Sequence, residues 1–106
     1  HPYFHCEECQ KVPESVKLDE IFFDADLLPE VLFIEPPRPG DRMRPFGRED
    51  EVKLKKLRTD RKIATAALRY LLKTPDGIIL WAPGVRHGAG CAVTATTSRI
   101  VRISLQ

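Results

Sequence analysis

Ten basic side chains within residues 38–62 form the part of the chain best suited to bind a ligand. They are Arg38, Arg42, Arg44, Arg48, Lys53, Lys55, Lys56, Arg58, Arg61 and Lys62. Five carboxylates share the segment, so its net charge is +5. An arginine fork pairs with phosphate through two hydrogen bonds, and lysine adds a point charge. The pattern therefore predicts binding to a nucleic-acid backbone.

The aromatic content of this segment indicates which nucleic acid would fit. Phe46 is the only aromatic residue in the segment, whereas proteins that bind single strands stack successive bases on aromatic rings. The composition favours contacts to the backbone or to the shape of a duplex. The prolines of "RPGDRMRPFG", residues 38–47, restrict the backbone and would hold several arginines in one geometry.

Two other interpretations of the charges are open. Residues 1–37 carry nine acids and two bases, and residues 38–106 carry fifteen bases and six acids. The two segments would neutralise each other as solvated faces of one fold. Alternatively, the basic face would dock on an acidic protein surface, such as the acidic front of a second copy in a homodimer.

A C-x2-C motif at the front of the chain is the candidate metal site. Cys6 and Cys9, with His1 and His5, supply two thiolates and two imidazoles, which suit tetrahedral zinc. Structural zinc sites normally take their second ligand pair from a distant segment, and no second C-x2-C occurs. Tail cysteines without a role are the alternative. A thioredoxin-type motif is disfavoured because no βαβ pattern begins at Cys6.

We find no catalytic motif in the sequence. His87 and Cys91 are four residues apart and would be either distant zinc ligands or a Cys–His pair, but such a pair is defined in space. A loop histidine and a small buried cysteine are the commoner arrangement. Neither G-x-x-x-x-G-K-[ST] nor G-x-G-x-x-G is present. The chain therefore has no nucleotide-binding fingerprint, and we expect it to hold no nucleotide cofactor.

The length of 106 residues suits one folded domain at 16–106, preceded by a tail or small metal-binding knuckle at 1–15. Its 42% hydrophobic and 30% charged residues are typical of a soluble protein, and its apolar stretches are too short to span a bilayer. Three cysteines without a wider framework argue against a secreted disulfide module, so the cytoplasm is the default location. The first residue is His, so we interpret the chain as a fragment.

The hydrophobic pattern predicts an α+β fold in the order strand, strand, helix, helix, strand, strand, with a mixed or antiparallel sheet. The first strand is expected within residues 16–26. A second, well-buried strand is expected within residues 27–37, where two prolines end the ladder. Residues 41–44 read as a short extended piece with Met43 pointing inward.

Two consecutive helices are expected in the middle of the chain. Residues 49–62 have acids at their start and two leucines spaced by three. Residues 59–73 show two apolar rows spaced by four. Strands are expected to follow at residues 77–84 and 98–106, joined by a glycine-bearing loop.

Four pieces of sequence, in a fixed order, resemble a known family. They are "RPGDRMRPFG", "KLKKLRTDRKI", "IILWAPGVR" and "AVTATTSRIVRISL". Together they resemble the C-terminal domain of tRNA(Ile)-lysidine synthetase over about residues 31–105. The chain departs from the pattern in the small loop after Arg86, and residues 1–11 match none of it.

The resemblance implies a non-catalytic α+β unit, related to a domain of the phenylalanyl-tRNA synthetase β subunit, that holds tRNA toward its acceptor stem. The parent enzymes are ATP-dependent ligases of tRNA modification, which attach lysine to an anticodon cytidine of isoleucine tRNA; their ATP and lysine sites would lie outside this chain. The family motifs cover Arg38, Asp41, Arg42, Arg44, Pro45, Gly47, Lys55, Lys56, Leu57, Pro83, Gly84 and Arg86. The bases among them, Arg86 included, are expected to face RNA, and Asp41 to fix arginine geometry by an ion pair.

Overall fold

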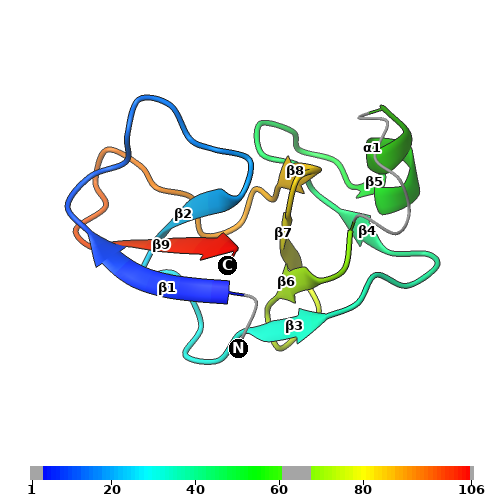
Figure 1. Cartoon of the computed structure of the whole chain (residues 1–106), viewed down its shortest axis with the longest axis horizontal. Coiled ribbons are helices and arrows are strands. Elements are labelled where there is room, and N and C mark those ends of the chain that lie inside the picture. The colour runs from blue at the N-terminus through cyan, green and yellow to red at the C-terminus, as the bar shows by residue number, and fades with distance from the viewer. Residues whose placement is uncertain (1–3, 61–67, 106) are drawn as a thin grey trace. The chain divides into compact units, whose positions relative to one another are not determined.

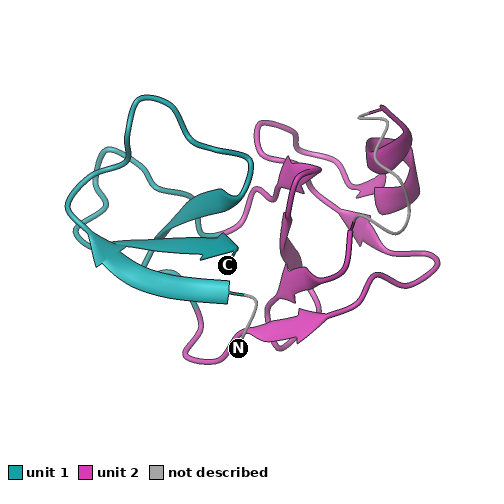
Figure 2. Ribbon diagram, in the orientation of Figure 1, with its two compact units in different colours: residues 1–28, 91–106 teal, residues 29–90 magenta. Residues whose placement is uncertain are grey.

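The computed structural model describes residues 4–60 and 68–105. The chain forms two compact units, residues 1–28 with 91–106 and residues 29–90, which we call unit 1 and unit 2 (Figure 2). Unit 1 carries seven acids and four bases, and unit 2 carries eight acids and thirteen bases. The net charges are therefore −3 for unit 1 and +5 for unit 2, which is a smaller asymmetry of the same sign as that between residues 1–37 and 38–106. The predicted division of the chain at residue 15 stays a prediction.

Unit 1 is a three-stranded antiparallel sheet with its C-terminal strand in the centre (Figure 1). Its strands are β1 (Phe4–Cys9), β2 (Glu20–Asp24) and β9 (Ile100–Leu105). Ile21 and Phe23 of β2 lie opposite Ile103 and Val101 of β9, and all four side chains are buried. Because side chains alternate along a strand, the neighbouring positions of β9 face the other way.

An ion-pair network covers this second face of unit 1. Arg102 donates from Nε to Glu20 Oε1 at 2.6 Å and from Nη1 to Glu7 Oε1 at 3.0 Å. The backbone N–H of Lys17 donates to Glu20 Oε2 at 3.0 Å. This backbone hydrogen bond and then the Arg102 guanidinium lower the pKa of Glu20, and burial of the carboxyl opposes them. Glu20 is therefore a buried carboxylate held in its charged form.

We expect Glu20 to make the free energy of unfolding depend on pH. A carboxyl whose pKa is lower in the folded state contributes stability that is complete above its unfolded pKa, about 4.3 for glutamate. This contribution is lost as the pH falls through the folded value. Glu20→Gln should be less stable than the wild type at about pH 7 and should lose less stability on going to about pH 3. Urea unfolding measures both; a difference that is constant across pH would contradict the role of Glu20.

Unit 2 contains a four-stranded antiparallel sheet, a two-stranded ladder and a short helix. The sheet has the order β3 (Phe33–Glu35), β6 (Leu71–Lys73), β7 (Ile79–Ala82) and β8 (Arg86–His87). The ladder pairs β4 (Arg42–Met43) with β5 (Val52–Lys53), and α1 (Leu54–Asp60) follows β5 directly. One buried cluster joins all three parts: Met43, Val52, Leu54, Leu57, Leu68, Leu71, Ile79, Ala82 and Val85.

The prediction of two consecutive helices is wrong. The described residues hold nine strands and a single helix of seven residues, in a small mixed fold. Residues 71–73, expected at the end of a second helix, form β6, which pairs with β3 and β7 and buries all three side chains. Pairing on both edges outweighs the helical spacing, because a short apolar run fits either structure. Residues 61–67 of that predicted helix lie outside the described residues.

Several other predicted elements are confirmed. Residues 16–26, 77–84 and 98–106 contain β2, β7 and β9. The short extended piece is β4, in which Met43 is 1% exposed and Arg42 is exposed. No helix in the described part of the chain is long and apolar enough to cross a membrane.

Three segments differ from their predictions. The strand within residues 27–37 is the edge strand β3, where Phe33 is 42% exposed, so the predicted deep burial is wrong. The helix expected over residues 49–62 begins only at Leu54, because the two preceding residues pair with β4 as β5. Residues 4–9 form β1 although they lack a strand-like alternation, because all six of them pair with β9.

Candidate functional site

The described members of the basic cluster lie on neighbouring segments of unit 2. They occupy the turn before β4, the β4–β5 ladder with its connecting loop, and α1. Antiparallel pairing sets Arg42 opposite Lys53, and the backbone N–H of Leu54, the first residue of α1, donates to the Asp41 carbonyl at 2.9 Å. These contacts tie the ladder and the helix to the turn. Arg61 and Lys62 lie outside the described residues.

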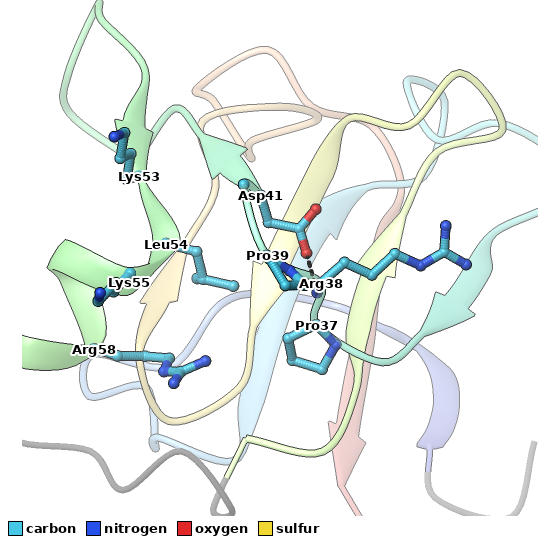
Figure 3. Close-up of a pocket in the computed structure, with 9 residues that line it drawn as sticks. Pro37, Arg38, Pro39, Asp41, Lys53, Leu54, Lys55 and Arg58 are labelled. Carbon is cyan, nitrogen blue, oxygen red and sulfur yellow. Dashed lines mark hydrogen bonds between the residues drawn. The ribbon is translucent and has the colours of Figure 1, made fainter.

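A pocket of about 520 Å³ opens where the turn, β5 and α1 meet, and we call it the basic pocket. It is lined by Pro37, Arg38, Pro39, Gly40, Asp41, Lys53, Leu54, Lys55 and Arg58. Figure 3 shows Arg58 extending from α1 toward Pro37, while the Arg38 side chain extends away from α1. Four bases and one acid line this hollow, which gives it the charge to attract an anion.

Asp41, the acid of the basic pocket, is engaged by groups of the protein itself. Its Oδ2 accepts a hydrogen bond from the backbone N–H of Arg38 at 2.7 Å, and its Oδ1 lies 3.6 Å from Lys73 Nζ. Among the described residues, the ion-pair partner of Asp41 is Lys73, and the expected ion pair with an arginine is not found there. The carboxylate shapes the turn, and its charge is balanced by a lysine outside the pocket lining.

Lys73 is the site residue that sequence reasoning missed. Its side chain is only 9% exposed and lies between two carboxylates, with Nζ 3.3 Å from Glu35 Oε2 on β3 and 3.6 Å from Asp41. In the sequence, Lys73 is a lysine that follows an apolar run, at the end of the segment with helical spacing. In the structure it links the central strand β6 to the wall of the basic pocket.

The described bases differ in whether acids neutralise them. Ion pairs at 3.0–3.9 Å join Arg42 to Glu51, Arg48 to Asp50 and Lys56 to Asp60. Within the described residues, no ion pair involves Arg38, Arg44, Lys53, Lys55 or Arg86. The second group can bind an anion without first displacing a carboxylate. Exposed ion pairs contribute little to stability, so whether a base is paired has little effect on the fold. It does affect how readily that base binds phosphate.

A second pocket, of about 420 Å³, is lined in part by both residues of β4. Its charged residues are Arg42, Arg44, Glu51 and Asp76, so bases and acids are equal in number. This balance makes it a weaker candidate for binding an anion than the basic pocket.

The predicted metal ligands are not gathered into a site in the part of the chain that the structure describes. Cys6 and Cys9 are three positions apart on β1, so the extended backbone directs their side chains to opposite faces. His5 Nε2 lies 3.7 Å from Glu7 Oε2, and His1 is outside the described residues. No group of three or more His, Cys, Asp or Glu suited to a metal is found among the described residues. Zinc at this motif stays a prediction.

The thiols of Cys91 and Cys6 favour the protonated form. Partial burial, and then the charge of Asp24, raise the pKa of Cys91, whose Sγ donates to the Leu27 carbonyl at 3.4 Å. Partial burial and the charge of Glu7 raise the pKa of Cys6 in the same way. A thiol that stays protonated is a poor nucleophile. Neither cysteine therefore has the activated character that nucleophilic catalysis requires.

Comparison with known proteins identifies the class of domain. Residues 32–104 match the family described as the TilS substrate C-terminal domain, which is more than half of the chain. The chain belongs to this family, and the resemblance read from its sequence is confirmed.

Two relatives carry the same particular name. The tRNA(Ile)-lysidine synthase of Symbiobacterium thermophilum is 30% identical over 96 residues, which are 90% of this chain and 20% of the relative. That of Geobacter sulfurreducens is 36% identical over 77 residues, which are 72% of this chain and 16% of the relative. The chain thus spans about a fifth or less of the length of these relatives.

Two solved structures share the fold. The crystal structure of a TILS C-terminal domain matches with a TM-score of 0.82 at 25% identity, over 99% of this chain and 87% of that one. An N-terminal fragment of the phenylalanyl-tRNA synthetase β subunit from Pyrococcus horikoshii matches with a TM-score of 0.67 at 17% identity, over 81% of this chain and 27% of that one. The second likeness concerns the fold alone.

Proposed function

We propose that this chain is the tRNA-holding domain of a tRNA(Ile)-lysidine synthase, and that unit 2 binds the tRNA backbone. The observation that carries the proposal is the basic pocket, with Arg38, Lys53 and Lys55 outside any ion pair in the described residues. The names of the two relatives support tRNA as the partner. The ATP-dependent attachment of lysine would be the work of other parts of the parent enzyme.

The domain would act by electrostatic positioning. Its bases would contact phosphates of the acceptor stem, and the contacts of Asp41 to the turn and to α1 would keep those bases in a fixed geometry. Phosphate contacts set the position and orientation of a nucleic acid and carry no sequence information directly. The isoleucine specificity of the enzyme would therefore come mainly from other contacts.

Binding of the domain to an acceptor-stem minihelix of isoleucine tRNA tests the proposal. The titration runs from low to moderate salt, with an unrelated minihelix and a single-stranded RNA as competitors. We expect binding that weakens steeply with salt and prefers either duplex to the single strand. Sedimentation across the same salt range tests the alternative: a dimer that dissociates with salt and ignores RNA would overturn RNA binding in favour of protein docking.

A further inference from the structure

Phe46 is the most exposed aromatic side chain in the part of the chain that the structure describes, at 60%. It lies in the loop between β4 and β5, two residues after Arg44 and two residues before Arg48. The next residue before it, Pro45, is almost fully buried. In this loop, the Pro45 side chain therefore points toward the protein interior and the Phe46 ring points toward solvent.

The backbone that carries this ring is fixed on both sides. The N–H of Phe46 donates to the His87 carbonyl at 2.9 Å, and the N–H of Arg48 donates to the Pro45 carbonyl at 3.0 Å. Gly47 completes this turn with a φ of 88°, which only glycine adopts readily. The exposure of Phe46 is thus a property of an anchored turn.

Residues that follow β8 complete the anchor. Pro45 forms a β-bridge with Gly88, and the N–H of Ala89 donates to the Arg44 carbonyl at 2.9 Å. A side chain at Gly88 would meet the carbonyl oxygen of Ile79 at 2.7 Å, so this close approach requires glycine. The backbone of the loop is therefore bonded to the sheet of unit 2 on both sides of Phe46.

An exposed ring in a loop that also carries arginines has the chemistry to bind one unpaired nucleotide. The flat face of phenylalanine stacks on a base, and an arginine pairs with the adjoining phosphate. Arg44 takes part in no ion pair among the described residues, whereas Arg48 is held by Asp50 through contacts at 3.0 and 3.2 Å. Arg44 is therefore the base available for such a phosphate. A lone ring accommodates one base and cannot bind a run of single strand.

We propose that Phe46 stacks on a single unpaired base next to the duplex that unit 2 binds, and that Arg44 contacts the phosphate of that nucleotide. This inference rests on the proposed function, since the duplex supplies most of the binding. It makes the domain a reader of the junction between paired and unpaired RNA. Specificity of this kind depends on RNA shape and tolerates any base.

Two hairpin RNAs with one shared stem test the inference, one blunt and one with unpaired nucleotides at the 3′ end. The wild type should bind the extended hairpin more tightly. Phe46→Ala should lose about 5- to 150-fold in affinity for the extended hairpin, which is the ~1–3 kcal/mol of one base–aromatic stack. The Phe46→Ala variant should bind the blunt hairpin as the wild type does. The Phe46→Trp variant should keep the preference of the wild type for the extended hairpin.

Phe33→Ala is the matched control, because Phe33 is the other exposed phenylalanine of the described chain and lies on the edge strand β3, outside the basic cluster. It should leave the affinities for both hairpins unchanged. An equal loss on both hairpins in Phe46→Ala, or no loss on either, would overturn the stacking role. Failure of the wild type to bind even the blunt hairpin would instead overturn the proposed function itself.

Discussion

Replacing Arg38, Lys53 and Lys55 together by glutamine should clearly reduce the salt dependence of tRNA binding. Each lost phosphate contact lowers the slope of log affinity against log salt by about one unit, so the variant should lose about three. At low salt, the affinity should fall by roughly tenfold per lost contact. All three residues line the basic pocket, and none of them forms an ion pair in the described structure.

The matched control neutralises three bases that acids already hold: Arg42, Arg48 and Lys56. Both triple variants change the net charge by the same amount, so their long-range attraction to RNA falls equally. The difference between their salt slopes therefore reports local phosphate contacts. We expect the control to lose clearly less slope and less affinity. Equal losses would show that net charge alone drives binding and would contradict a binding role for the basic pocket.

The basic cluster is visible in the sequence because charge, proline and glycine content are properties of a segment; its role in binding RNA stays a prediction. The turn at Pro39 and Gly40 and the inward Met43 follow from local chemistry that the fold does not override. Which bases are neutralised could not be predicted in the same way. The pairs of Arg42 with Glu51 and of Arg48 with Asp50 depend on the β4–β5 pairing and on the conformation of its loop.

The fold was harder to predict where a strand has partners at both edges and all of its side chains are buried. The run that contains Leu71 and Leu72 has helical spacing, but β3 and β7 pair with it from both edges. Burial of every side chain removes the alternation by which a strand is recognised. The assignment of this segment to a helix also concealed the role of Lys73, because a lysine at the end of a helix is expected to be exposed to solvent. Only the tertiary structure places its ammonium group between two carboxylates.

Replacing Lys73 by methionine should lower the free energy of unfolding by about 2–4 kcal/mol. Removing one partner of a buried ion pair costs about 3–5 kcal/mol because the remaining charge is left uncompensated. The Glu35 side chain is 30% exposed, and solvent there reduces the cost. Methionine keeps most of the side-chain volume, so the loss reports charge and little cavity formation. Urea unfolding at neutral pH measures it, with Lys56→Met as the exposed control that should change stability by under about 1 kcal/mol.

The triple variant Lys73→Met, Glu35→Gln, Asp41→Asn separates lost charge balance from lost packing. It removes both uncompensated carboxylates, and the asparagine still offers an oxygen to the backbone N–H of Arg38. Stability should therefore recover a large part of the loss seen in Lys73→Met. Lys73→Met should weaken RNA binding, because the turn that carries the basic pocket loses its ion pair to Lys73. The salt slope of binding should stay unchanged, because Lys73 does not line the pocket. A reduced slope would mean that Lys73 contacts phosphate directly, and no recovery in the triple variant would mean that its packing, rather than its charge, holds the turn in place.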